Sequence, residues 1–285
     1  AMDSWWTGVP GGVSQTGWLG RWLDATAEGE PDPLRAVALG GGARALVATR
    51  STSTVVHSPE AFRLRTLPGV DADALVDAFV ATAAPLSPIP ALAAAQGANP
   101  AAVEAVDVLA QVSGADEAAV TGLGDPGGES VVDLLRTAAG IIDLGIGTRV
   151  ITVGIGGFDT HADQADRQAQ LLADVGEGVA GFFEQLESDG NAGDVLLMTT
   201  TEVGRRVGEN GSGGTDHGTA GLQFVCGADV VGGVVHGGYD LAQLDQGDLP
   251  VLVDTRSVYA EVLDWLGGPT DEILDGRHDR LGVLT

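Results

Sequence analysis

The fold of this chain is decided by RVITVGI, residues 149–155, and by the segments that follow it. This heptapeptide is apolar at most positions, which is typical of a strand buried on both faces of a parallel sheet. A long helix is predicted over 162–187, where apolar residues recur at three- and four-residue spacing on one face. VLLMTT, residues 195–200, is the next buried strand. The three segments predict a strand–helix–strand unit with a right-handed crossover.

Outward from this unit, the chain alternates between short strand candidates and amphipathic helices, which indicates an α/β protein. Further strands are expected at 36–39, 45–49, 222–225 and 230–235, and further helices at 18–23, 71–84, 101–112, 129–142 and 255–266. The prolines of PLSPIP, residues 85–90, interrupt regular structure. We expect one α/β domain over residues 1–285, with an alanine-rich helical lobe at about 66–145.

Aromatic residues and cysteine are unevenly used. Four of the five tryptophans, at positions 5, 6, 18 and 22, lie near the start of the chain. Such side chains pack against another layer of the fold or line a binding surface, and core packing is the preferred interpretation. The single cysteine, Cys226, excludes an intrachain disulfide and is expected to be a buried, unreactive thiol.

The chain is strongly acidic, with a net charge of −26 from 40 acidic residues and 14 arginines, and it contains no lysine. Such a field repels nucleic acid and anionic membranes, so neither is an expected partner. No uncharged apolar run reaches the length of a membrane span. A small anionic substrate would need local positive charge, from a metal ion or from the few arginines, to offset this field.

Titratable side chains follow both predicted strands of the central unit. Asp159 and His161 come directly after the first strand, in GGFDTHADQ, and their spacing points them to the same side of an extended segment. Glu202 and Arg205 follow the second strand, in TTTEVGRR. Ligands of open α/β sheets bind beyond the carboxyl ends of strands, so these four residues are candidate site residues.

A third group lies in GSGGTDHGTA, residues 211–220, where Asp216 and His217 are adjacent and flanked by glycines. His236 ends another short strand before a glycine pair. Mixed carboxylate and imidazole ligands suit a borderline divalent ion such as zinc, manganese or iron. The sequence therefore predicts a metal site to which Asp–His pairs contribute.

Each of these motifs also has a purely structural interpretation. Asp216 and His217 would form an Asx turn with a solvated histidine. Asp159 or Thr160 would be the N-cap of the following helix. Glu202 would form a surface ion pair with the neighbouring arginines. The occurrence of three such loops at strand ends, in one half of the chain, favours the metal site.

These motifs resemble those of the sulfatase-like proteins grouped as domain of unknown function 1501. The similarity lies in GFDTHADQ, TTTEVGRRVGENGSGGTDHGTAG, VVGGVVHGG and TRSVYAEVLDWLG, and AMDSWWTG also matches the middle region of the family. Family members belong by similarity to the alkaline phosphatase superfamily. The resemblance implies a three-layer α/β/α sandwich with a mostly parallel central sheet and a divalent-metal site, for which zinc or manganese is expected.

The same resemblance distributes the candidate ligands over two metal positions. It implies that Asp159 and His161 hold one ion and that Asp216 and His217 serve a second. His236 lies near the position of a late histidine ligand in the superfamily.

The resemblance also implies candidate catalytic residues. Glu202 and Arg205 match the Thr-Glu-Phe-Gly-Arg block of the family, with Val203 in place of the usual phenylalanine. Arg205 would bind a substrate oxygen through a bidentate contact. The implied activity is metal-dependent hydrolysis of a phosphate or sulfate ester.

Two elements of the family pattern are not in this chain: a first strand ending in an aspartate-bearing turn, and a Ser-His-Phe stretch before the Met-Asp. The nucleophile and one further ligand are therefore expected outside it, in an upstream part of a longer protein or in a separate polypeptide that completes the fold. The alternative is a non-catalytic scaffold that binds a metal or a partner at the cell envelope. Twin-arginine signals in relatives imply export to the periplasm, the envelope or the exterior.

Overall fold

The computed structural model describes residues 2–11, 14–29, 32–56, 69–112, 130–202, 204–219 and 221–285. The chain divides into two compact units, which are described in turn. The first unit consists of Ala1–Glu28, Arg44–Arg50 and Gly156–Thr285, and the second of Gly29–Ala43 and Ser51–Ile155. Every candidate site residue belongs to the first unit.

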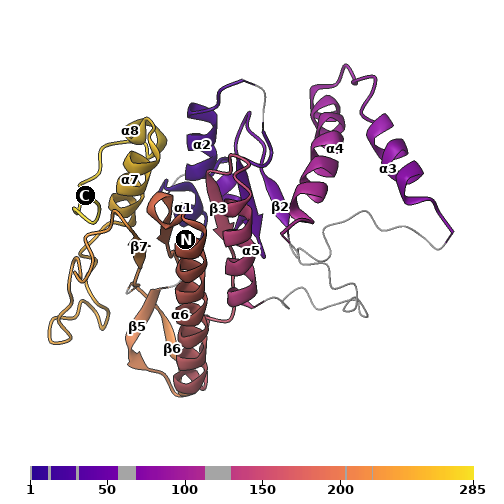
Figure 1. Ribbon diagram of the computed structural model, residues 1–285. Helices are drawn as coiled ribbons and strands as arrows, with labels where there is room; N and C mark the ends of the chain where they lie inside the picture. The colour runs from indigo at the N-terminus through magenta and orange to yellow at the C-terminus, as the bar shows by residue number, and fades with distance from the viewer. Residues whose placement is uncertain are drawn as a thin grey trace. The chain divides into compact units, whose positions relative to one another are not determined.

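The second unit is built on a three-stranded parallel sheet in the order β2–β1–β3 (Figure 1). β1 (Ala36–Leu39) lies between β2 (Thr54–Val56) and β3 (Val150–Val153). All four residues of β1 are fully buried, as the unbroken apolar run AVAL predicts for a central parallel strand. The strand predictions at 36–39 and within 149–155 are confirmed.

The helices of the second unit account for the described part of the alanine-rich region. α5 (Val131–Asp143) contacts β3 and begins after Ser130, whose hydroxyl accepts a hydrogen bond from the backbone N–H of Asp133 at 3.2 Å. α3 (Ala72–Ala81) and α4 (Pro90–Leu109) pack against each other. The predicted helices at 71–84, 101–112 and 129–142 are confirmed. α4 begins earlier than predicted: Pro90 stands at the first helical position, where proline is tolerated, and the helix continues through Pro100.

The core of the first unit joins helices from both ends of the chain. These helices are α1 (Met2–Thr7), α2 (Trp18–Ala25), α7 (Thr255–Leu266) and α8 (Thr270–Ile273). Trp18 stacks on Tyr259 with ring centroids 4.5 Å apart. The indole N–H of Trp22 donates to the carbonyl of Gly267 at 2.8 Å, so that this buried ring also has its polar atom satisfied. Trp18 and Trp22 therefore pack in the core, as preferred from the sequence.

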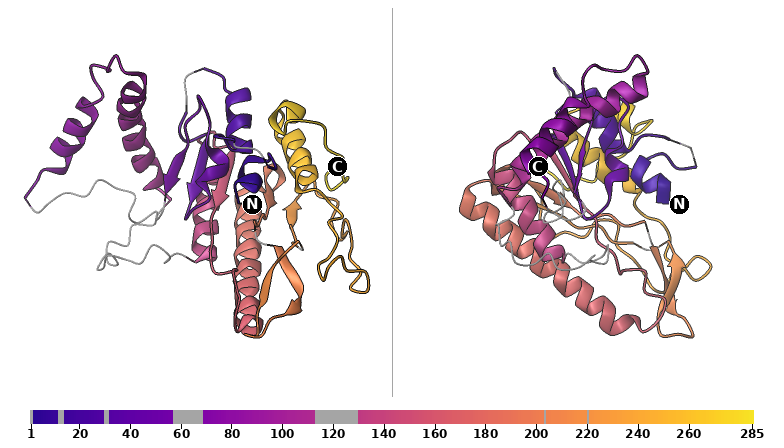
Figure 2. Two further views of the ribbon diagram at one scale, coloured as in Figure 1. Left: turned by 180° about the vertical axis from the view of Figure 1, so that it is seen from behind. Right: turned by 90° about the vertical axis from the view of Figure 1, so that its right-hand side faces the viewer.

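The rest of the first unit consists mainly of a long helix and two antiparallel ladders. The helix is α6 (Gln164–Asp189). β4 (Leu196–Met198) pairs with β7 (Val225–Gly227), and β5 (Gly204–Glu209) pairs with β6 (Thr215–Gly218). The β5–β6 hairpin lies beside one end of α6 (Figures 1 and 2). In the part of the chain that the structure describes, no helix combines the length and apolar character needed to cross a bilayer.

Several strand predictions are corrected by the structure. The segment predicted as a strand at 45–49 begins in a 3-10 helix, η1 (Ala43–Leu46), because a short apolar run does not distinguish the two structures. The segment 230–235 forms only an isolated bridge from Val230 to Leu284, since its paired glycines weaken a strand. Within the second unit β3 pairs with β1, and within the first unit β4 pairs with β7. The mixed α/β class itself is confirmed.

Candidate metal centre

Three side chains from two distant segments converge in the first unit. Asp159 and His161 lie in the loop before α6, and His217 lies on β6. Oδ1 of Asp159 is 3.0 Å from Nε2 of His161 and 2.9 Å from Nε2 of His217. The two Nε2 atoms are 3.0 Å apart. The three atoms thus form a nearly equilateral triangle, and these residues are positioned to hold a metal ion.

The donor set fits a transition-metal ion. Zinc binds imidazole nitrogens and carboxylate oxygens, so Asp159, His161 and His217 offer a set of ligands that would hold such an ion. The side chains of Asp159, His161 and His217 are 59%, 45% and 59% exposed, so further coordination positions would face solvent. Three protein ligands and an open side are typical of catalytic sites, whereas structural zinc sites are closed by four protein ligands.

The β5–β6 hairpin supplies more than one contact to Asp159. Arg205 lies directly opposite His217 in the ladder, so both side chains project from the same face. Nη2 of Arg205 donates to Oδ1 of Asp159 at 2.7 Å and to the carbonyl of Phe158 at 2.9 Å, while Nη1 donates to the carbonyl of Thr215 at 2.6 Å. The Arg205 side chain is only 17% exposed. It therefore ties the Asp159 loop to β6.

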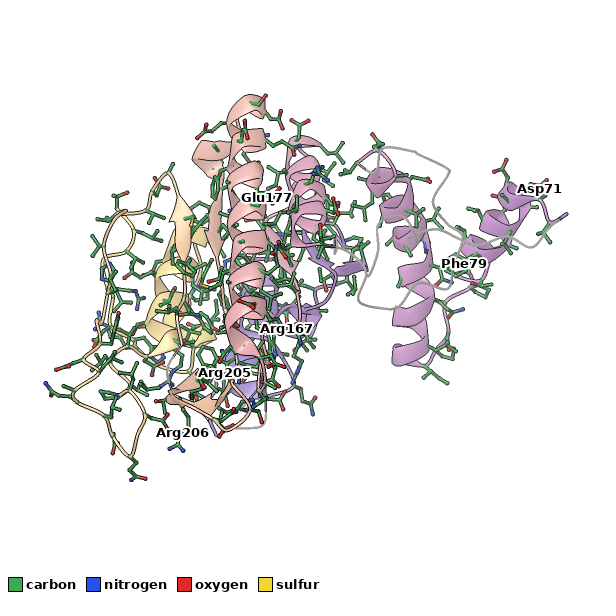
Figure 3. All side chains as sticks on the ribbon, turned by 90° about the horizontal axis from the view of Figure 1, so that it is seen from below. Asp71, Phe79, Arg167, Glu177, Arg205 and Arg206 are labelled. Carbon is green, nitrogen blue, oxygen red and sulfur yellow. The ribbon has the colours of Figure 1, made fainter. Side chains whose placement is uncertain are left out.

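Arg206, the neighbour of Arg205, has a different environment. Figure 3 labels both arginines on the hairpin. Nε of Arg206 lies 3.5 Å from Oδ1 of Asp248, and its Nη2 donates to the carbonyl of Gln246 at 3.0 Å. Neither arginine pairs with Glu202 in the part of the chain that the structure describes, so the predicted surface ion pair is wrong.

The charge of Asp159 is stabilised by its surroundings. The hydrogen bond with His217 lowers the pKa of Asp159 below its usual value, and the nearby charges of His161 and Arg205 act in the same direction. Asp159 is therefore held in the ionised form that a metal ligand requires.

Asp216 occupies a different place from its neighbour His217. Its Oδ1 accepts a hydrogen bond from Nδ2 of Asn210 at 3.1 Å and lies 3.6 Å from Nδ1 of His161. The hydrogen bond from Asn210 is the main cause that lowers the pKa of Asp216. Asp216 thus faces Nδ1 of His161, the ring nitrogen on the side away from the triangle. Its assignment to a second metal stays a prediction.

The glycines of the hairpin turn allow the two segments to approach closely. A Cβ atom on Gly214 would lie 2.2 Å from the carbonyl carbon of His161. The backbone N–H groups of Asp163 and Gln164 donate to the carbonyls of Ser212 and Gly213 at 3.1 and 2.9 Å. The start of α6 is therefore fastened to the turn. Its N-cap is Asp163, so the alternative that placed the cap at position 159 or 160 is wrong.

The remaining predicted residues lie outside the triangle. Nε2 of His236 is buried and has no hydrogen-bond partner among the described residues. Glu202 precedes β5 and is half-buried. The metal-competent cluster found in the described residues contains neither of them, and their roles stay predictions. Position 203, which interrupts the family block, lies outside the described residues.

Asn210 is the residue of the site that sequence reasoning missed. Its side chain bridges the hairpin turn, the loop before α6 and Asp216. The signal in the sequence was the Asn-Gly pair at 210–211, which is typical of a tight turn between two strands.

Fold and site together define a mixed α/β protein with an Asp–His–His cluster that is positioned to hold a metal ion. The chain belongs to the family described as protein of unknown function (DUF1501), whose sequence profile matches residues 7–282. Searches among curated proteins and among solved structures find no match to the chain.

Proposed function

We propose that this protein binds a divalent transition-metal ion through Asp159, His161 and His217 and uses it to hydrolyse a phosphate or sulfate ester. The observation that carries the proposal is the triangle of ligand atoms, with sides of 2.9–3.0 Å, on an exposed face. The similarity to the alkaline phosphatase superfamily supports the choice of ester and the expectation of a three-layer fold. The family resemblance makes zinc or manganese the proposed ion, and imidazole ligands suit zinc.

The charge of the protein supports a metal-dependent reaction. With a net charge of −26, the chain repels an anionic ester. A bound divalent ion would supply local positive charge and Lewis-acid activation of an ester oxygen or a water molecule. Asp159, His161 and His217 would hold the ion while leaving its solvent side open, and Arg205 would fix Asp159 in place. In this proposal Arg205 positions the Asp159 loop instead of binding the substrate, since its guanidinium already donates to three oxygens.

The second candidate is a non-catalytic metal-binding protein of the same fold, which would interact with a partner at the cell envelope. The hydrogen bonds of Arg205 to Asp159 and to two backbone carbonyls favour this second candidate, because a substrate oxygen would have to compete with them. The family resemblance also implies export and a separate polypeptide that completes the fold. Both expectations are compatible with either candidate.

Metal analysis and turnover distinguish the two candidates. The purified full chain is titrated with Zn²⁺, Mn²⁺ and Co²⁺ and assayed with an aryl phosphate and an aryl sulfate, with and without a chelator. His217→Ala should weaken metal binding and abolish turnover. The control is His278→Ala, because His278 lies near the carbonyl of Leu274 rather than in the triangle. Metal-dependent turnover would support the hydrolase. Because the nucleophile is expected outside this chain, metal binding without turnover would favour the scaffold only if turnover is still absent when the missing part of the fold is supplied. Absence of metal binding would contradict both candidates.

A further inference from the structure

His161 can use Nε2 as a ligand only if the other ring nitrogen carries the proton of the neutral imidazole. A carboxylate placed near that nitrogen favours this tautomer, as in the carboxylate–histidine pairs that surround many metal ions. Here Oδ1 of Asp216 lies 3.6 Å from Nδ1 of His161. This separation exceeds a hydrogen bond, so the effect of Asp216 depends on how firmly its carboxylate is held.

Asn210 holds both partners at once. Its Nδ2 group donates to the carbonyl of His161 at 3.0 Å and to Oδ1 of Asp216 at 3.1 Å. Its Oδ1 accepts from the backbone N–H groups of Ser212 and Gly214 at 2.9 and 3.1 Å. These contacts fix the orientation of the amide, because its donors face oxygen atoms and its acceptor faces N–H groups.

The geometry points to Asn210 as a positioning residue, which holds Asp216 against Nδ1 of His161 and thereby presents Nε2 to the metal. The inference rests on the proposed metal site and adds a residue to it. Asn210 touches none of the three ligand atoms, so it acts through Asp216 and through the backbone of His161.

Asn210→Asp separates this role from a purely structural one. The aspartate keeps an oxygen that accepts from the two turn N–H groups, but it loses the donor to His161 and places a carboxylate beside Asp216. Asn191→Asp adds the same charge in the same unit, two residues after the end of α6, and is the matched control. The expected result is Co²⁺ binding that is about 10–100-fold weaker in Asn210→Asp and unchanged in the control.

The tautomer of His161 gives a second measurement that does not depend on activity. Nitrogen NMR of the Zn²⁺-loaded full chain reports which ring nitrogen of His161 binds the ion and which carries the proton. Wild type should bind through Nε2, with the proton on Nδ1, and Asn210→Asp should lower the fraction of His161 that binds in this way at a given Zn²⁺ concentration. Asp216→Asn, which keeps the shape of the side chain, should lower this fraction too and serves if Asn210→Asp folds poorly.

The outcomes of the inference and of the proposed function are distinguishable. If wild type and Asn210→Asp bind Co²⁺ equally and share one tautomer, the role of Asn210 is overturned while the metal site stands. If wild type binds no Co²⁺, the proposed function fails. The role of Asn210, which rests on that metal site, is then overturned with it.

Discussion

Arg205 and His217 lie directly opposite each other in the β5–β6 ladder, and both contact the same oxygen, Oδ1 of Asp159. A single hairpin thus presents a guanidinium and an imidazole to one carboxylate. This arrangement explains why the loop before α6 has a defined position although its acidic and imidazole side chains are largely exposed.

The contacts of Arg205 predict a loss of stability when it is removed. Arg205→Ala should reduce the free energy of unfolding by about 2–4 kcal/mol, because three oxygens lose a charged donor that is mostly buried. Chemical denaturation measures this change. Arg206→Ala is the control, since the Arg206 side chain is 45% exposed, and should shift stability by less than about 1 kcal/mol. Equal effects of the two substitutions would contradict the positioning role of Arg205.

The close approach at Gly214 predicts that its substitution opens the site. In Gly214→Ala the new methyl group would meet the backbone of His161, so the loop must move. We expect metal affinity to fall by at least about tenfold, measured by Co²⁺ titration. Gly211→Ala is the control, because a Cβ atom at Gly211 meets nothing within 4 Å in the described residues. Unchanged affinity in Gly214→Ala would show that the loop position does not matter for metal binding.

Asp264 predicts a pH dependence of stability in the first unit. Its carboxylate pairs with Arg280 at 2.6 Å and accepts from the hydroxyl of Thr270, and the hydrogen bond with Arg280 is the main cause that lowers its pKa. A lowered pKa contributes stability that is fully present above the unfolded value, about 3.9, and is lost as the pH falls through the folded value.

The measurement compares wild type with Asp264→Asn between about pH 3 and pH 7. The advantage of wild type in the free energy of unfolding should be constant from about pH 5 upward and shrink below about pH 4. Asp77→Asn, at an exposed position of α3, is the control. A difference between wild type and Asp264→Asn that does not change with pH would exclude the carboxylate charge as its source.

Glu261 predicts how the C-terminal segment is attached to α7. Its buried carboxylate, only 6% exposed as a residue, accepts from the backbone N–H groups of Gly282, Val283 and Leu284 at 2.6, 2.9 and 3.2 Å, and also from that of Leu281. Glu261→Gln replaces one acceptor oxygen with a donor that faces these N–H groups. The free energy of unfolding should fall by about 2–4 kcal/mol in urea denaturation. Glu272 is exposed, so Glu272→Gln should change the free energy of unfolding little. A comparable loss in that variant would argue against the hydrogen bonds of Glu261 as the cause.

Local sequence signals predicted the helices well. α7 was expected at 255–266 and has these bounds, because Asp254 caps its start and Gly267 ends it. β1 was expected at 36–39 because four consecutive apolar residues lie between less apolar neighbours. The pairing of strands was less predictable, since β4 pairs antiparallel with β7 through contacts between residues far apart in the chain.

The site was predicted in part. The spacing of Asp159 and His161 correctly placed two ligand atoms together. Which member of the Asp216–His217 pair joins them depends on the register of the β5–β6 ladder, including the irregularity between Arg205 and Glu209. A shift of one residue exchanges the two faces of a strand, and no local pattern in the sequence specifies this register.

The span between the ligands has a thermodynamic consequence. His161 and His217 are 56 positions apart in the chain, so an ion shared by their imidazoles would act as a removable cross-link closing a long loop. Such a link forms only when the hairpin is assembled, so the free energy of metal binding adds to the stability of the folded state. The melting temperature of the protein should therefore rise with the concentration of free metal and return to its starting value when the ion is withdrawn.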